Sequence, residues 1–449
     1  MSFPSITLKR LDLALPPFEL YRRLRPEFDT SFILESAVGS TRTIAYSFLG
    51  FGPADKLVCR NGAVEGGIGL DHLREDPGAY LKKLVERFEI PLPRFPFIGG
   101  LVGYFSYEFS GRAEPSVRSL PSEFPEFELG LYRECVIYDH SSFQAYLLSV
   151  GEPGPLNEMM GSLPGPMYRE LKAGPMLPQG RERFEDGVRT IKDRIGAGET
   201  FQTVLSRRVS APYRGELLNH YAALRDLNPS PYMFFLDFGD RTVLGSSPET
   251  LLTVRGRDAT TFPIAGTRPL GEGRHRRQYR QELLSDEKER AEHAMLVDLA
   301  RNDLSKVCAG GSVSVPEYMR VEEFSHVQHI VSKVQGTLRD DRSAMDALIS
   351  VFPAGTVSGA PKPRSMEIIG QIEGAGRGPY GGGVGYVSFN GNLDSAITIR
   401  SAFACDGRLY FQAGAGIVAD SDPGREFEET EHKLGALRQS LARATEVEA

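Results

Sequence analysis

The stretch GGGVGYVSFNGNLDSAITIRSAFACDGRLYFQAGAGIVA, residues 381–419, decides the fold class of this chain. It contains runs rich in β-branched and aromatic residues, namely GGVGYVSFN, SAITIRSAFACDG and RLYFQAGAGIVA, and glycine-containing turns mark their ends. Runs of this length and composition predict strands, and the short turns between them predict antiparallel pairing. The C-terminal third is therefore expected to be built on antiparallel sheet.

The same strand pattern extends toward the N-terminus. Between about residues 30 and 150, runs such as SFILES, RTIAYSFLG, GGLVGYFSYEF and ECVIYDHSSFQAYLLSV are separated by Gly and Pro turns. Helices interrupt the strands irregularly. One of them, over residues 181–196, places Phe184, Val188, Ile191 and Ile195 on a single apolar stripe. Because strands and helices do not alternate as in βαβ folds, the pattern predicts an α+β fold with large antiparallel sheets.

Composition excludes several classes of protein. The chain has 449 residues, 41% of them hydrophobic and 25% charged, and a net charge of -7, which does not favour binding to nucleic acid or to an anionic membrane. The first residues lack a long apolar run, so neither a signal peptide nor a membrane span is expected, and a cytoplasmic protein is the default. The four cysteines (Cys59, Cys135, Cys308 and Cys405) are far apart, which argues against a zinc cluster, a redox motif or a disulfide framework.

The chain divides into three regions by composition. Residues 151–180 concentrate proline and glycine without sustained periodicity, which is typical of a linker. We therefore expect an amino-terminal region over residues 1–150, a linker over residues 151–180, and a carboxyl-terminal region over residues 181–449. Most motifs that carry chemistry lie in the last of these.

Two pairs of glutamates are candidates for metal binding. Glu289 and Glu292 lie three residues apart in a predicted helix over residues 288–303, and Glu426 and Glu429 have the same spacing in the first turns of the last helix. Each pair therefore lies on one helical face, and two such helices brought together would surround one point with four carboxylates. Hard oxygen ligands suit Mg²⁺. The alternative is that these acids only favour the helix dipole at two solvated N-termini.

Basic and glycine-rich segments near the C-terminus are candidates for anion binding. Arg400 ends the apolar run SAITIR, where its guanidinium could hold a carboxylate or, alternatively, reach past the strand end to solvent. The backbone N–H groups of Gly414, Ala415 and Gly416 could form an anion-binding nest. Close packing within a sheet is the structural alternative for these glycines.

Two further motifs, one of histidines and one of glycines, have patterns that are also found in functional sites. His326 and His329 form an HxxH pattern without a third metal ligand nearby, so His329 is either a proton-transfer residue or a structural histidine. Residues 376–381, GRGPYG, formally match the GxGxxG dinucleotide fingerprint. They follow a predicted helix and precede a strand, whereas the fingerprint must end a strand and open a helix, so a nucleotide site is not expected here.

Many long motifs, in this order, resemble the chorismate-utilising enzymes: FPIAGTRP, AEHAMLVDLARNDL, HIVSKVQGTL, FPAGTVSGAPKPRSMEII, YGGGVGYV, SAITIRS, QAGAGIV and EFEETEHK. The resemblance covers roughly residues 181–440 and is closest to the large subunits of anthranilate synthases. The amino-terminal region matches less closely, through FILES, AYSFLGFGP and the later NPSPYMFF. The resemblance implies two large antiparallel β-sheets packed as a sandwich with helices on the outside.

The resemblance also implies a role for each matching residue. Glu292 and Glu429 match direct Mg²⁺ ligands, while Glu289 and Glu426 match residues that hold metal-bound water. Arg400 and Tyr386 match the pair that holds the enolpyruvyl carboxylate of chorismate. His329 matches the proton-transfer histidine, and Glu249 matches the acid that protonates the leaving hydroxyl. The residues that match the pocket wall are Gly266, Thr267, Thr356, Gly414, Ala415 and Gly416.

Two positions bear on the reaction within this family. Members that add water to chorismate resemble one another in carrying a lysine base where this chain has Gln202, and ammonia needs no such base. Aminodeoxychorismate synthases carry a lysine where this chain has Ala265, which cannot be a nucleophile. The resemblance therefore implies direct, Mg²⁺-dependent addition of ammonia at C2 and loss of pyruvate to give anthranilate, the first step of tryptophan biosynthesis.

The resemblance implies a protein partner and an inhibitor. The chain has no nucleophilic cysteine motif of a glutamine amidotransferase, so a separate glutaminase subunit is expected to supply ammonia. Members of the family are often inhibited by tryptophan bound between an LES and an NPSPYMF segment. The residues here that match this inhibitor site are Leu34, Glu35, Ser36, Pro231, Tyr232 and Met233.

Three alternatives stay open at this point. An aminodeoxychorismate synthase component I or a 2-amino-2-deoxyisochorismate synthase would share the scaffold and differ in the product. A noncatalytic metal-binding or regulatory homologue would keep only the fold. The presence of all four acids together with His329 favours an enzyme.

Overall fold

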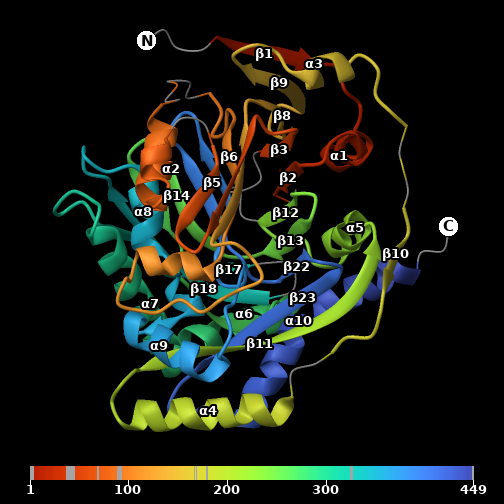
Figure 1. Cartoon of the computed structure of the whole chain (residues 1–449). Coiled ribbons are helices and arrows are strands. Elements are labelled where there is room, and N and C mark those ends of the chain that lie inside the picture. The colour runs from red at the N-terminus through yellow and green to blue at the C-terminus, as the bar shows by residue number, and fades with distance from the viewer. Residues whose placement is uncertain are drawn as a thin grey trace.

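Two antiparallel sheets dominate the computed structural model, which describes residues 5–36, 46–67, 70–87, 90, 94–165, 167, 169–177, 180–323 and 327–446 (Figure 1). Each strand pairing found in these residues is antiparallel, as the turn pattern of the sequence predicts. Strands from before residue 150 and from after residue 180 occur in both sheets. The assignment of separate roles to these two regions stays a prediction.

The first sheet has twelve strands among the described residues. In spatial order these are β1 (Ile6–Leu11), β9 (Gln144–Val150), β8 (Glu134–Asp139), β3 (Tyr46–Phe51), β2 (Ser31–Glu35), β12 (Tyr232–Asp237), β13 (Arg241–Ser247), β22 (Ser401–Cys405), β23 (Arg408–Ile417), β11 (Gln202–Gly215) and β10 (Leu171–Ala173). The short strand β19 (Gly359–Ala360) pairs with the start of β11.

The second sheet has eleven strands among the described residues. In spatial order these are β16 (Ile264–Pro269), β18 (Val327–Thr337), β15 (Asp258–Thr261), β14 (Thr250–Arg255), β21 (Leu393–Ile397), β20 (Gly383–Ser388), β6 (Gly100–Phe105), β7 (Phe127–Tyr132), β4 (Asp55–Arg60) and β5 (Ala63–Gly66). The outer strand β17 (Ser314–Glu323) pairs with β18.

A shared apolar core joins the sheets. Phe48 on β3 lies 5.7 Å, ring centroid to ring centroid, from Tyr386 on β20, and the largest cluster of buried residues draws on strands of both sheets. Aromatic pairs at such distances add to the free energy gained by burying their area. The sandwich that the resemblance implied is therefore the observed architecture.

The segment that opened the sequence analysis passes between the sheets. β20 and β21 belong to the second sheet, whereas β22 and β23 belong to the first, so the chain crosses at residues 398–400. The prediction of one continuous run over SAITIRSAFACDG is wrong at this point. Arg400 adopts a φ of 52°, in the left-handed region that non-glycine residues seldom occupy, and this turn separates the two strands.

Helices cover the outer surfaces. A second buried cluster contains apolar residues of α1, α5 and α10 against the outer face of the first sheet. Figure 1 shows β1, β9 and α3 at one end of the molecule and α4 and α9 at the other. The helices are α1 (Pro17–Leu24), α2 (Pro77–Glu86), α3 (Pro155–Met159), α4 (Arg181–Gly196), α5 (Leu218–Leu227), α6 (Gly273–Ser285), α7 (Glu287–Ser305), α8 (Ala344–Val351), α9 (Lys362–Glu373) and α10 (Pro423–Glu446), with 3₁₀ turns η1 (Arg25–Glu27), η2 (Asp71–Leu73), η3 (Tyr107–Arg112) and η4 (Gly355–Val357).

Sequence predictions about the helices and the linker can be compared with the structure. The stripe predicted on α4 is largely buried, with Phe184, Val188 and Ile191 all inside. The expected linker, residues 151–180, contains the short elements α3 and β10. Among the described residues, no helix is both long and apolar enough to cross a bilayer.

Candidate active site

Four glutamates predicted as metal ligands lie on α7 and α10. Asp286 caps α7 by accepting hydrogen bonds from the backbone N–H groups of Lys288 and Glu289, which fixes the start of the helix. One turn on, Glu292 accepts a 2.7 Å hydrogen bond from Gln202 Nε2 on β11. Glu289 is paired with Arg268, and Glu429 on α10 is paired with Lys433 at 2.6 Å.

The two helices bring their carboxylates into mutual electrostatic range. Burial raises the pKa of Glu292, and the nearby charges of Glu289 and Glu429 raise it further against the lowering effect of the Gln202 hydrogen bond. Burial also raises the pKa of Glu426, to which Glu429 adds. Lys288 lowers the pKa of both Glu292 and Glu426, so one cation lies near both helices. This proximity argues against two unrelated capping turns.

The donor set fits a hard divalent cation. In the described part of the chain, no three His, Cys, Asp or Glu side chains are gathered closely enough to form a complete metal site. Glu289 and Glu429 are engaged by Arg268 and Lys433, which a bound cation would have to displace. Burial is the main cause of the raised pKa of Glu292, and the negative charges of Glu289 and Glu429 add to it. An oxygen-only set of carboxylates suits Mg²⁺.

Arg400 is a cation without a partner. Its guanidinium makes no hydrogen bond or ion pair with any described residue, and burial lowers its pKa, partly offset by the nearby Tyr380 and Glu429. An uncompensated guanidinium in a buried place costs free energy unless an anion binds to it. This arrangement favours the carboxylate-holding role over a strand end that reaches to solvent.

The residue next to Arg400 is Tyr380, not Tyr386. Both Arg400 and Glu429 act on the pKa of Tyr380, which burial raises. Tyr386 instead contacts Arg255, whose guanidinium carbon is 5.9 Å from the ring centroid, and lines a different cavity. The predicted pairing of Tyr386 with Arg400 is therefore wrong. The physical reason is that Tyr386 lies inside strand β20, whose register places it opposite Asp394, well before the crossover.

His329 on β18 is held by the opposite strand. Its Nδ1 atom lies 2.8 Å from the carbonyl oxygen of Gly266 and 3.2 Å from Thr267 Oγ1. A β-bulge between Ala265 and Thr267, with Gly266 at a φ of 64°, turns that carbonyl toward the ring. Because a carbonyl only accepts, Nδ1 carries the proton and Nε2 keeps its lone pair in the neutral ring. The other histidine of the HxxH pattern, His326, lies outside the described residues.

Burial and Arg400 keep His329 neutral. Burial lowers the pKa of the imidazole, and the positive charge of Arg400 lowers it further, against a raising effect of the Gly266 carbonyl. A neutral ring with a fixed tautomer can accept a proton at Nε2. His329 thus has the state that a general base needs near neutral pH.

Glu249 is a buried carboxylic acid near Thr356 and Lys433. Burial raises its pKa to about 7, with Thr356 and Lys433 offsetting part of that increase. Its backbone carbonyl accepts a 3.0 Å hydrogen bond from the N–H of Ile397 at the end of β21. A carboxyl group with this pKa can donate a proton at neutral pH.

The glycines of β23 admit neighbouring side chains. A Cβ atom on Gly414 would lie 2.7 Å from the Tyr380 hydroxyl oxygen, and one on Gly416 would lie 2.6 Å from Gln202 Nε2. β11 pairs with β23 as far as Ile417, whereas β22 pairs with it only as far as Phe411. One backbone edge of residues 414–416 is therefore not paired with any described strand. Close packing is observed at Gly414 and Gly416, whereas anion binding by the backbone N–H groups of residues 414–416 stays a prediction.

A family model described as chorismate binding enzyme matches residues 29–439. This chain belongs to the chorismate-binding enzymes. It is 45% identical over 433 residues to anthranilate synthase component 1 of Methanothermobacter thermautotrophicus, covering 95% of this chain and 92% of the relative.

Two solved structures share the chorismate-binding fold. Anthranilate synthase component I from Streptococcus pneumoniae superposes with a TM-score of 0.79 at 34% identity, covering 94% of this chain and 98% of that one. A menaquinone-specific isochorismate synthase from Escherichia coli superposes with a TM-score of 0.75 at 20% identity, covering 98% and 95%. At that identity, the second likeness shows the fold alone.

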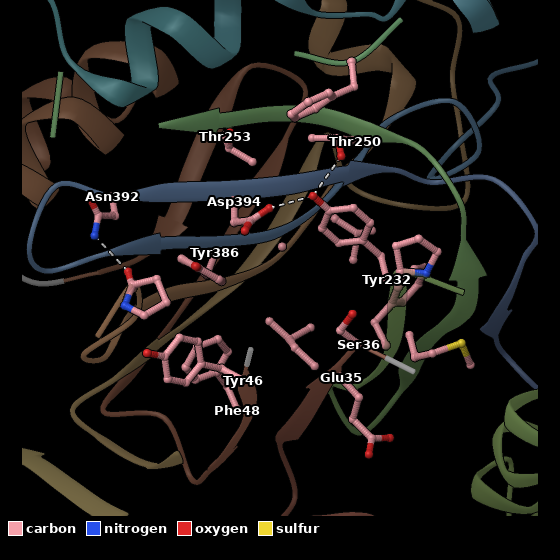
Figure 2. Close-up of a pocket in the computed structure, with 18 of the residues that line it drawn as sticks. Glu35, Ser36, Tyr46, Phe48, Tyr232, Thr250, Thr253, Tyr386, Asn392 and Asp394 are labelled. Atoms are coloured by element: carbon pink, nitrogen blue, oxygen red, sulfur yellow. Dashed lines mark hydrogen bonds between the residues drawn. The ribbon is translucent and has the colours of Figure 1, made fainter. Parts of the chain in front are cut away.

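A cavity of this chorismate-binding enzyme lies away from the glutamates of α7 and α10. It has a volume of about 870 Å³ and lies between the ends of β2 and β12 on one side and β14, β20 and β21 on the other (Figure 2). None of the four predicted metal ligands lines it. The residues predicted for tryptophan binding all do, namely Leu34, Glu35, Ser36, Pro231, Tyr232 and Met233.

The cavity has one polar end. The hydroxyl of Tyr232 donates to Asp394 at 3.0 Å and lies 2.9 Å from Thr250 Oγ1. Figure 2 shows the Glu35 carboxyl directed away from these groups, and it instead accepts hydrogen bonds from Tyr221 and Arg225. The Ser36 hydroxyl is buried and has no hydrogen-bond partner among the described residues. Ser36 is thus better placed than the Glu35 carboxyl to meet a ligand.

Sequence reasoning missed two residues of the candidate active site. Tyr380 and Lys433 both lie beside Gly414, since Lys433 Nζ donates to the Gly414 carbonyl at 2.9 Å. The spacing of Lys433, four residues after Glu429 on a helix, was an available signal. Tyr380 offered no comparable signal, because its position depends on the turn before β20.

Proposed function

We propose that this chain adds ammonia to C2 of chorismate and eliminates pyruvate to form anthranilate. One observation carries the proposal: an unpartnered guanidinium (Arg400), a neutral histidine (His329) and a carboxylic acid with a pKa of about 7 (Glu249) are gathered beside the glutamates of α7 and α10. The relatives that are 39–45% identical are named anthranilate synthase component 1, which supports the same reaction. Chorismate and ammonia yield anthranilate, pyruvate and water.

The proposed mechanism assigns each proton to a residue. Arg400, with Tyr380 beside it, holds the enolpyruvyl carboxylate. Ammonia forms the C2–N bond as the C4–O bond breaks, and Glu249 protonates the departing hydroxyl, which leaves as water. His329 Nε2 then takes the ring proton from C2 while the C3–O bond of the enolpyruvyl ether breaks, which leaves an aromatic ring. The released enolpyruvate takes up this proton from His329 at its methylene carbon to become pyruvate. The ammonium nitrogen on the ring returns a proton to Glu249 and becomes the amine.

A magnesium ion is part of the proposal. Glu292 and Glu429 would hold it directly, with Glu289 and Glu426 acting through water. When bound, Mg²⁺ would hold the ring carboxylate and stabilise negative charge as a Lewis acid. The support from this chain is that Glu289 and Glu429 lie close enough to Glu292, and Glu429 close enough to Glu426, to add to the pKa increase that burial causes.

Gln202 and Ala265 favour anthranilate over other products of the family. Gln202 Nε2 donates to Glu292, so its amide faces the centre of the site and supplies no base that would activate water. Ala265 lies next to the Gly266 bulge and offers no nucleophile to the ring. Aminodeoxychorismate and 2-amino-2-deoxyisochorismate remain the alternative products to be sought in the assay.

The product assay tests this function. We expect the purified chain, incubated with chorismate, Mg²⁺ and ammonium, to form anthranilate, identified by its fluorescence and mass. Omission of Mg²⁺ or addition of a chelator should abolish product formation. A mass corresponding to either alternative product, or unchanged chorismate, would refute the assignment.

We further propose that a separate glutaminase subunit supplies the ammonia. The relatives carry the designation component 1, and the sequence contains no glutaminase motif of its own. Glutamine alone should therefore not replace ammonium in the assay of the isolated chain. Glutamine should become a nitrogen source when the glutaminase from the same organism is added.

We also propose that the 870 Å³ cavity binds tryptophan as a feedback inhibitor. Replacing Ser36 by Ala should raise the tryptophan concentration needed for half inhibition by about fivefold, since a buried hydrogen bond contributes roughly 1 kcal/mol. Anthranilate formation at increasing tryptophan concentration measures this. Ser142→Ala, an exposed serine at the β8–β9 turn, should leave the inhibition curve unchanged. If the inhibition curves of the Ser36 variant and the wild type are equal, Ser36 does not bind tryptophan.

A further inference from the structure

Arg377 is a buried cation that the proposed mechanism does not use. Its side chain is 1% exposed, and it donates twice to the Glu373 carboxylate, at 2.9 Å from Nε and 2.6 Å from Nη2. Its remaining donors go to backbone carbonyls: Nη1 to Val357 at 2.6 Å and Nη2 to Val204 at 2.8 Å. The guanidinium thus joins three segments that are distant in the sequence.

Those segments carry walls of the proposed active site. Val357 follows Thr356 in η4, and Val204 lies on β11 two residues after Gln202. The guanidinium carbon of Arg377 lies 5.7 Å from the ring centroid of Tyr380, which lies next to Arg400. Arg377 therefore contacts Tyr380 directly and binds backbone carbonyls within two residues of Thr356 and Gln202.

Other contacts fix Arg377 itself. The Glu108 carboxylate, from the amino-terminal region, accepts the backbone N–H groups of Arg377 at 2.7 Å and Gly378 at 3.0 Å. Glu373 also accepts both the backbone N–H and the hydroxyl of Ser206 on β11, each at 2.8 Å. Because both carboxylates are bound on several sides, the guanidinium has little freedom to move.

We infer that Arg377 is a positioning residue for chorismate: it holds η4, the start of β11 and Tyr380 at fixed positions around Arg400. The inference rests on the proposed function. Lysine cannot replace it, because an ammonium group lacks the planar set of donors needed to reach Glu373 and two carbonyls together. Displacement of the walls by about 1 Å is enough to lower a rate by about 100-fold.

The test compares two buried Arg–Glu pairs. Arg241 donates to Glu128 at 2.7 and 2.8 Å between β13 and β7, away from the proposed active site. Both Arg377→Lys and Arg241→Lys should lower Tm, because each weakens a buried charge pair. We expect only Arg377→Lys to raise the KM for chorismate at least about tenfold and to lower kcat/KM about 100-fold. Chorismate binding with Mg²⁺ and without ammonium should weaken in parallel.

A second variant separates positioning from stability. The double change Arg377→Gln with Glu373→Gln removes both buried charges and should recover part of the Tm without recovering KM. If KM returns together with Tm, or if Arg377→Lys behaves like Arg241→Lys, the inference is overturned. If Arg377→Lys does not fold, the double variant decides alone. Failure of the wild-type chain to form anthranilate would instead refute the proposed function.

Discussion

Glu292→Gln is expected to reduce Mg²⁺-dependent anthranilate formation by at least about 10³-fold, the loss that corresponds to several kcal/mol of charge stabilisation in the transition state. Glutamine keeps the shape of the side chain but removes the charge that the metal requires. Gln202 already donates to this carboxylate, so the variant amide still has a neighbour with which to form a hydrogen bond. The rate of anthranilate fluorescence and the equilibrium affinity for Mg²⁺ measure the effect.

The fold should survive this change. Burial and the charges of Glu289 and Glu429 raise the pKa of Glu292 in the folded state, so its ionised form opposes folding above the unfolded pKa. Removing that charge should leave Tm at pH 8 unchanged or higher. Glu287→Gln, on the same helix but exposed, should match wild type in rate and metal affinity. Activity of the Glu292 variant within tenfold of wild type would contradict its role as a metal ligand.

Periodicity accounts for most of the fold that the sequence predicted. The α4 stripe is buried because its apolar residues recur at helical spacing, and the antiparallel pairing follows from short turns between β-rich runs. α6 was not predicted, because Leu283 is its one buried residue among the described positions and gives no periodic signal. The crossing of the chain between the sheets at residues 398–400 was also missed, because apolar and polar residues keep alternating through it.

Pairs of site residues on one element were easier to predict than pairs brought together by tertiary structure. The spacing of Glu289 with Glu292 and of Glu426 with Glu429 follows from helix geometry alone. Whether Tyr380 or Tyr386 lies next to Arg400 depends on strand register, which no local pattern near the two tyrosines specifies. The state of Glu249 likewise depends on burial by segments distant in the sequence, so its pKa of about 7 required the fold.

Glu249→Gln is expected to lower kcat/KM by about 10²- to 10⁴-fold, the usual contribution of a general acid. It should also change the pH profile. The acid must be protonated, so with a pKa of about 7 its active fraction falls as pH rises through that value. The alkaline limb of kcat/KM near pH 7 should therefore be present in wild type and absent in the variant. The acidic limb, where His329 takes up a proton below its lowered pKa, should remain in both.

The measurement must separate this limb from the ionisation of ammonium and from other buried acids. Rates are therefore compared at constant free NH₃ rather than at constant total ammonium. Glu108 provides the matched control, because burial also raises its pKa to about 7 although it contacts the 377–378 backbone rather than the reacting atoms. Glu108→Gln should keep the alkaline limb whatever its effect on rate. If the alkaline limb persists in Glu249→Gln and disappears in Glu108→Gln, the titrating group is Glu108, which contacts the Arg377 backbone. Glu249 would then not be the proton donor.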